Sequence, residues 1–277
     1  MTEGQKQHQA EHFDDLGSPA FEIHRPHGES RFYRYLMEFK LGRAVALLPG
    51  GVGGCRVLSL CCGSGMDAEF MGRLGAEVVA LDISHGALLR ARERAGIYGL
   101  SYRLVRGDSE RLPFADDSFD VSFVHDGLHH LPDPWIAIAE MARVARRGVI
   151  ITEPANAAFT KLAIRLRLIP AEEDAGNFVV RFDAPALRHF FGARGFHGFV
   201  STRYLVKYGH PPGRWLRVFD HPMLFELVRN VFELVGVRLL GGLGNKLSVA
   251  ASRTPVHGYA HGESAYTSSM GVRTVWT

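Results

Sequence analysis

The chain has 277 residues, of which 46% are hydrophobic, enough for one full-sized globular domain with appended segments. Its formal net charge of +3 is too small to indicate nucleic-acid binding by itself. Residues 1–155 carry 17 basic against 21 acidic side chains, and residues 156–254 carry 14 against 7. The front part therefore suits a cationic ligand and the back part an anionic one, unless both are ordinary solvated surface.

Three cysteines, Cys55, Cys61 and Cys62, are clustered and odd in number, without the spacing of a disulfide framework or a zinc site. A reducing, cytoplasmic location is the default expectation. The first 15 residues are polar and lack the apolar stretch of a signal peptide. The sequence contains no run of about 18 apolar residues, so we expect no membrane-spanning helix.

In chain order, the first 20 residues are polar, and a helix is predicted over roughly 29–48, where large apolar side chains recur at helical spacing. The sequence Leu48-Pro49-Gly50-Gly51 ends this helix. Residues 1–48 form an arm that precedes the first strand, and we expect this arm to fold over a ligand site as a lid.

The stretch 56–84 carries the clearest pattern in the chain. An apolar run enters a turn with Gly63 and Gly65, an amphipathic segment follows, and a second apolar run ends in Asp82. This order is typical of the first half of a nucleotide-binding α/β domain. The acid lies 19 positions after Gly63, close to the spacing of about 20 expected for a residue that holds ribose hydroxyls.

The alternation of strands and helices continues beyond this stretch. Ser84 is a good N-cap for a helix that ends near Gly96. Strands are predicted over 102–106, 119–125 and 149–152, with a helix around 135–141 before the last of them. Short apolar strands that alternate with helices predict a parallel sheet with right-handed crossovers.

The second half of the chain is less regular. We expect a helix over 156–169, an acidic loop over 169–176, a helix over 184–194 capped by Asp183, and strands over 199–207 and 246–251. Asp220 is expected to cap a strong helix whose apolar face forms core or lid, a substrate pocket or a dimer interface. That face consists of Leu224, Leu227, Val228, Val231, Leu234 and Val235. Residues 255–277 show no periodicity and are expected to be disordered.

Five motifs in order resemble the class I S-adenosylmethionine-dependent methyltransferases, in particular the small-molecule branch that includes the ubiquinone and menaquinone methyltransferases. They are LSLCCGSG, Asp82 after the second strand, Gly107-Asp108, LPF-x-D-x-SFD, and LHHLPDP. The resemblance covers about residues 56–154. It implies an α/β, Rossmann-like sheet of seven mostly parallel strands, the last one antiparallel, with helices on both faces. The domain would span 49–254, with helical cap insertions at about 156–181 and 208–243.

The same resemblance implies the cofactor S-adenosyl-L-methionine and the product S-adenosyl-L-homocysteine. Gly63 and Gly65 would lie against the methionine part of the cofactor, and Asp82 would accept hydrogen bonds from both ribose hydroxyls. The further contacts implied are Cys61 in the turn, Ile83 on the adenine, Asp108 on its amino group, Ser109 at the base edge and His125 beside the cofactor.

Ser59 departs from the family pattern, which usually has an acid at this position. That acid helps to hold the ammonium end of the cofactor. A serine can donate or accept a hydrogen bond but carries no charge. Recognition of the amino group would therefore depend on backbone carbonyls or on another carboxylate.

A general base is needed only if the methyl acceptor must lose a proton. The candidates are His125, His129, Glu153 and Tyr33, with Asp126 and His24 as further options. Turn packing is the alternative role for His129, and a buried structural carboxylate is the alternative for Glu153. Cys61 and Cys62 read as small packing residues rather than nucleophiles, and no metal is expected.

Nucleic acid is disfavoured as the acceptor, because the fourth strand ends in His-Asp-Gly-Leu and no basic run with interleaved aromatics is present. A small molecule with an apolar body and an anionic group, of natural-product or isoprenoid type, fits the aromatic and net positive back half. A homo-oligomer could form through the N-terminal arm or the 220–237 helix.

Two other functions stay open at this point. An NAD(P)-dependent oxidoreductase would use a similar sheet, although it has no reason to carry the LPF-x-D-x-SFD and LHHLPDP block. A methyltransferase-like binding module without catalysis is compatible with Ser59. Both compete with the prediction of a small-molecule methyltransferase.

Overall fold

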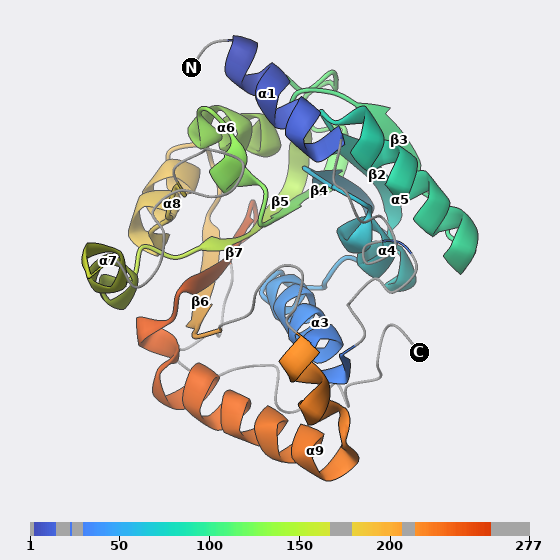
Figure 1. The fold of residues 1–277 in the computed structure, drawn as a ribbon. Helices are drawn as coiled ribbons and strands as arrows, with labels where there is room; N and C mark the ends of the chain where they lie inside the picture. Colours follow the sequence, from blue (N-terminus) through green and yellow to red (C-terminus); the bar gives the residue numbers. More distant parts are fainter. Residues whose placement is uncertain (1–2, 15–22, 24–29, 167–178, 207–213, 256–277) are drawn as a thin grey trace.

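The computed structural model describes residues 3–14, 23, 30–166, 179–206 and 214–255. Their strands form one seven-stranded sheet in the order β3-β2-β1-β4-β5-β7-β6, with helices on both sides (Figure 1). The strands are β1 Arg56–Leu60, β2 Glu77–Asp82, β3 Arg103–Arg106, β4 Phe119–His125, β5 Ala145–Pro154, β6 Gly198–Tyr204 and β7 Lys246–Ser252.

The longer helices are α1 Glu3–Asp14, α3 Arg31–Ala46, α4 Met66–Arg73, α5 His85–Tyr98, α6 Pro134–Val144, α7 Ala158–Arg165, α8 Ala184–Gly192 and α9 Pro222–Val231. Short 3₁₀ helices are η1 Leu128–His130, η2 Arg214–Asp220 and η4 Gly241–Leu243. The π-helix η3 Phe232–Leu239 continues α9.

The predicted sheet is confirmed. Neighbouring strands from β3 to β5 are parallel, and β7 alone runs antiparallel to both of its neighbours, β5 and β6. His125, the last residue of β4, is level with Thr152 of β5. The carboxyl ends of β1, β2, β4 and β5 therefore meet at one edge, where open α/β sheets bind their ligands.

Apolar layers cover both faces of the sheet, which explains the near-continuous apolar runs of its central strands. Leu58 and Leu60 face the layer formed with α6 and α8, whereas Val57 faces the layer formed with α3 and α4. The strand alternation thus directs Ser59 to the same face as Val57. This places Ser59 on the side of the sheet that α3 and α4 cover.

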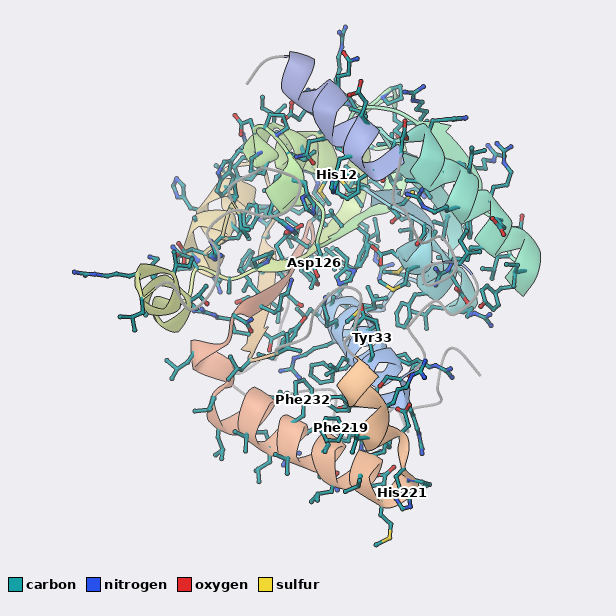
Figure 2. All side chains as sticks on the ribbon, viewed as in Figure 1. His12, Tyr33, Asp126, Phe219, His221 and Phe232 are labelled. Carbon is teal, nitrogen blue, oxygen red and sulfur yellow. The ribbon has the colours of Figure 1, made fainter. Side chains whose placement is uncertain are left out.

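An aromatic cluster joins α3 to α9 and η3 beside the sheet. The ring of Phe39 lies 5.1 Å from that of Phe232 and 5.4 Å from that of Tyr204. Figure 2 shows Tyr33, Phe219 and Phe232 in this region between α3 and α9. The aromatic cluster comprises Phe32, Tyr35, Phe39, Tyr204, Phe219, Phe225 and Phe232.

Most predicted elements appear near their predicted positions. The helix predicted over 29–48 is α3, the strand over 119–125 is β4, and the side chain of Ser84 caps α5 by accepting from the amide of Ala87 at 2.9 Å. The fifth strand is longer than predicted, because it begins at Ala145 directly after α6. Helix α1 was not predicted, because its 12 residues are polar on every side.

The prediction that Asp220 caps the helix after it is wrong. His221 is the N-cap of α9, and its side chain makes no capping hydrogen bond. The Asp220 carboxylate instead accepts from the hydroxyl of Ser30 at 3.2 Å and the amide of Arg31 at 2.5 Å. It therefore serves the N-terminus of α3, 190 positions earlier in the chain.

The apolar face predicted for the 220–237 helix is not core. Leu227 is 58% exposed and Leu234 is 51% exposed, whereas the buried residues of this helix are Phe225 and Gly236. The helix packs inward through its aromatic side chains and through Val228, whereas most of its other aliphatic side chains are exposed. This outward apolar face is unusual for a helix of a globular domain.

The structure corrects the predicted role of Asp183 and leaves two predicted segments untested. Asp183 is the N-cap residue of α8, but its carboxylate accepts from the side-chain amide of Asn156 at 2.6 Å rather than from the helix. The acidic loop over 169–176 and residues 256–277 of the predicted tail lie outside the described residues. In the described part of the chain, no helix has the length and apolar character needed to cross a membrane.

We predict that Glu69→Ala lowers the free energy of unfolding by about 3–5 kcal/mol, because it removes the carboxylate that pairs with the buried Arg94 guanidinium. Glu69 and Arg94 are almost fully buried, and Arg94 Nε donates to Glu69 at 2.7 Å. Urea denaturation measures the change. The control is Glu226→Ala, whose exposed pair with Arg229 should contribute at most about 1 kcal/mol. Equal losses in both variants would contradict the prediction.

Candidate functional site

The glycine turn after β1 leaves space for a ligand. Gly63 has a φ of 51°, and a Cβ built there would meet no described atom within 4 Å. Gly65 has a φ of 83°, and its Cβ would lie 2.7 Å from the hydroxyl of Tyr102 and 3.1 Å from Cβ of Ala91. Gly65 is thus required for packing against α5, whereas Gly63 is open to close approach by a ligand.

Cys61 stands at the start of this turn with a φ of 49°, a conformation that favours glycine. Its sulfur lies 3.4 Å from the hydroxyl of Ser109. Burial raises the pKa of the Cys61 and Cys62 thiols, and the nearby Asp82 carboxylate raises both further. Both thiols therefore stay protonated, as expected of packing residues rather than nucleophiles.

Asp82, at the end of β2, holds the turn in place. One carboxylate oxygen accepts from the amide of Gly63 at 2.9 Å, and the other accepts from the amide of Ser84 at 2.9 Å. Burial raises the pKa of this carboxyl, and the hydrogen bonds from Ser84 and Gly63 oppose that rise. The side chain retains lone pairs that can accept from hydroxyl groups of a ligand.

Asp108 and Ser109 follow β3 at the same edge. Asp108 accepts from the amide of Glu110 at 2.8 Å and pairs with the ammonium of Lys6 at 2.6 Å. Ser109 is buried through its contact with Cys61. Ile83 is partly buried, and its carbonyl accepts from Arg106 at 3.1 Å. The predicted ribose and adenine residues are thus brought together beside the glycine turn.

Helix α1 lies across this edge of the sheet (Figure 1). Lys6, near its start, pairs with Asp108 and Glu110. Asp14, at its end, accepts from the hydroxyl of Ser84 at 2.6 Å and the amide of Gly86 at 2.7 Å. The arm predicted as a lid therefore contacts the site through α1, and it is held by polar contacts that apolar periodicity could not reveal.

A buried charged cluster lies at the ends of β4 and β7. Asp126, with a φ of 51°, pairs with Lys40 of α3 at 2.6 Å and also with Lys246 of β7. Burial opposes ionisation, but Lys246 and Lys40 hold the pKa of the Asp126 carboxyl well below its usual range. Figure 2 shows Asp126 between the sheet and α3. Asp126 was a candidate from sequence, but neither lysine was, because they lie 86 and 120 positions away from it.

His125 faces Asp67 on one side and Asp126 on the other. Its Nδ1 lies 3.1 Å from the carboxylate of Asp67, and its Nε2 lies 3.4 Å from that of Asp126. Nε2 makes no hydrogen bond within the described residues. A carboxylate that fixes one ring nitrogen and leaves the other to act on a substrate is the arrangement used by histidine bases. Asp67 was not predicted, because it lies 58 positions from His125.

Glu153 is fully buried and anchors the turn after β4. It accepts from the amides of Gly127 at 2.8 Å and Leu128 at 2.7 Å, and its other oxygen lies 2.6 Å from Nδ1 of His129. These contacts match the alternative roles considered from sequence, a structural carboxylate and a packed histidine. Asp126, His129 and Glu153 also place potential ligand atoms within 4.8 Å of one another. The two lysines on Asp126 disfavour a metal cation at that position.

Tyr33, His24 and Ser59 are the remaining candidates from sequence. Tyr33 is buried in α3 beside the aromatic cluster, and His24 lies outside the described residues. Ser59 is fully buried, and its hydroxyl has no hydrogen-bond partner in the described part of the chain. An unpartnered buried hydroxyl is costly unless a ligand or water satisfies it.

The methyltransferase domain family matches residues 58–152. Among curated relatives, the demethylmenaquinone methyltransferase of Renibacterium salmoninarum is 34% identical over 139 residues, which cover 49% of this chain and 53% of the relative. That of Mycobacterium sp. (strain KMS) is 39% identical over 140 residues, covering 49% and 55%. The chain thus spans about half the length of the curated relatives it matches.

Solved structures share the fold at low sequence identity. A SAM-dependent methyltransferase from Thermotoga maritima has a TM-score of 0.59 and 18% identity, covering 90% of this chain and 100% of its own. Magnesium protoporphyrin IX methyltransferase from Synechocystis has a TM-score of 0.59 and 16% identity, with the same coverage. Residues 58–152 are thus similar to the methyltransferase domain family, and the sheet has the fold of these solved methyltransferases.

Proposed function

We propose that the chain is an S-adenosylmethionine-dependent methyltransferase with a small-molecule acceptor. The observation that carries this proposal is the buried Asp82 carboxylate, held by the amide of Gly63 beside the open turn. The family match over 58–152 and the curated relatives, whose names describe demethylmenaquinone methylation, support it. A solved neighbour with bound S-adenosylhomocysteine has the same fold.

The residues at the sheet edge suit the proposed cofactor. Asp82 would accept from the ribose hydroxyls, Ile83 would contact the adenine, and Asp108 with Ser109 would contact its polar edge. Gly63 would let the backbone approach the methionine part. The unpartnered hydroxyl of Ser59 lies on the side of the sheet that α3 and α4 cover. When bound, the cofactor supplies an electrophilic methyl group on a sulfonium ion. The protein then has to position the acceptor in line and exclude water.

Ser59 stands at the strand position where methyltransferases of this kind usually have an acid. The ammonium group of the cofactor would therefore lack that negative charge. Asp67 is a carboxylate on α4, held against His125 at the end of β4. Strand alternation directs His125 to the same face as Ser59, because Ser59 is level with Phe123 of β4. Asp67 thus offers a negative charge on the face where Ser59 lacks one.

We also propose His125 as the base for acceptors that must lose a proton. Asp67 orients the ring through Nδ1, so that Nε2 can take the proton. Asp67 and Asp126 would then stabilise the resulting imidazolium. Glu153 and His129 act indirectly in this proposal, because they fix the turn that follows His125.

The acceptor that best suits the surroundings has an apolar body and an anionic group. The aromatic cluster offers apolar contacts beside the sheet, and Lys246 offers a cation at its edge with its side chain 13% exposed. Natural-product and isoprenoid-type compounds combine these properties. The unpaired cysteines support a cytoplasmic location for the reaction.

Binding tests the cofactor assignment directly. We predict that S-adenosylhomocysteine raises the melting temperature of the full chain and that NADH does not. Asp82→Asn should weaken S-adenosylhomocysteine binding about 5- to 150-fold, because a buried charged acceptor for the ribose is lost. Calorimetric titration measures the affinity.

The matched control is Asp117→Asn, at an exposed turn with a φ of 54° that asparagine tolerates. This variant should retain the affinity of the unmodified chain for S-adenosylhomocysteine. Stabilisation by NADH alone would favour the oxidoreductase instead. An unchanged affinity in Asp82→Asn would show that Asp82 does not hold the ribose.

Removal of the His125 imidazole separates catalysis from cofactor binding. With an acceptor found in a panel of phenols, carboxylates, amines and prenylated compounds, His125→Ala should lower kcat about 10²- to 10⁴-fold. The affinity for S-adenosylhomocysteine should change much less. The control is His189→Ala, an exposed histidine of α8. If His125→Ala leaves kcat unchanged for an acceptor that must lose a proton, His125 is not the base for that acceptor.

A further inference from the structure

Helix α9, its continuation η3 and the turns beside them expose more large apolar side chains than any other part of the described chain. Figure 1 shows α9 at the margin of the molecule, away from the sheet. Ten large hydrophobic residues between 218 and 243 are at least 37% exposed. They are Val218, Met223, Leu224, Leu227, Val231, Leu234, Val235, Leu239, Leu240 and Leu243.

The protein already uses the opposite side of this helix. The ring of Phe225 lies 6.0 Å from that of Tyr35, and the ring of Phe232 lies 5.1 Å from that of Phe39. A Cβ on Gly236 would lie 2.8 Å from the carbonyl oxygen of Leu205. Since α3 and β6 cover this inner side, the outer aliphatic side chains serve no internal packing.

The outer side chains lie on one face by their spacing. Met223, Leu227 and Val231 are four residues apart in α9, which aligns them along one side of the helix. Leu234, which is 51% exposed, follows them in η3. We call these four residues the α9 face. Exposed apolar area of this extent, gathered on one element, marks an interaction surface rather than scattered surface hydrophobics.

Charge decides between the partners for this surface. The acids of the helix lie away from the α9 face, because Glu226 pairs with Arg229 at 2.7 Å and Glu233 accepts from the hydroxyl of Tyr35 at 2.8 Å. Arg238, four residues after Leu234, is exposed. The net exposed charge that accompanies the apolar surface is therefore positive.

We propose that the α9 face docks on an anionic lipid surface, with Arg238 directed to the headgroups. An amphipathic helix with aliphatic side chains and basic residues on one side lies in the plane of such an interface. A second copy of the chain is a poorer partner, because a twofold contact through the same patch would bring equal positive charges together. The proposal is independent of the methyl-transfer reaction.

Vesicle sedimentation with the full chain tests this proposal. One set of vesicles is pure phosphatidylcholine, and the other contains about one third phosphatidylglycerol to give a negative surface. We expect tighter binding to the anionic vesicles, and weaker binding as salt is added. Light scattering on the same samples without vesicles reports the oligomeric state.

Two sets of variants locate the contact. L227S/L234S should weaken binding to anionic vesicles about tenfold or more, because two half-exposed leucines can no longer enter the apolar region. The matched control is L89S/I97S on α5, whose side chains are 46% and 45% exposed, and it should bind like the unmodified chain. R238Q should weaken binding to anionic vesicles about fivefold and leave binding to phosphatidylcholine unchanged.

Three results would overturn the proposal. One is the absence of sedimentation with anionic vesicles, and another is an equal loss of binding in the α5 control. The third is a dimer in solution that L227S/L234S converts to a monomer, which would assign the α9 face to a second copy. Circular dichroism of each variant verifies that it is folded.

Discussion

The carboxylate of Asp82 fixes the geometry on which the proposed site depends. It accepts from Gly63 in the turn after β1 and from Ser84 at the start of α5, so one side chain joins two neighbouring loops at the sheet edge. Burial makes this charge expensive, and the amide donors compensate for it. Because the glycine turn keeps an open approach at Gly63, the charge stands where hydroxyl groups of a bound nucleoside can reach it.

A second charged centre organises the other end of the edge. Asp126 forms ion pairs with Lys40 of α3 and Lys246 of β7. The ring of His125 lies between Asp126 and Asp67 of α4. Three elements distant in sequence, α3, α4 and β7, thus converge at the end of β4. Buried ion pairs of this kind contribute little net stability against apolar packing. Their position next to the aromatic cluster is consistent with a role in acceptor binding and proton transfer.

Local patterns predicted the sheet and the glycine turn because strand periodicity, Gly63 and Asp82 are close in sequence. The same patterns could not predict Lys40, Lys246 or Asp67 as partners, since those contacts form only when distant elements pack. Helix α1 was not predicted because polar contacts of Lys6 and Asp14 hold it, and such contacts leave no apolar periodicity in the sequence. The apolar face around Leu227 was visible in sequence, but periodicity does not tell whether such a face is buried.

The central claim is that the Asp82 edge binds the nucleoside of S-adenosylmethionine. A crystal structure of the chain with S-adenosylhomocysteine measures this most directly. We predict that both ribose hydroxyls lie within about 3 Å of the Asp82 carboxylate oxygens, the distance of a normal hydrogen bond. We also predict that the methionine chain runs along Gly63 toward Ser59 and Asp67. A ligand bound elsewhere, with Asp82 still bonded only to Gly63 and Ser84, would contradict the account.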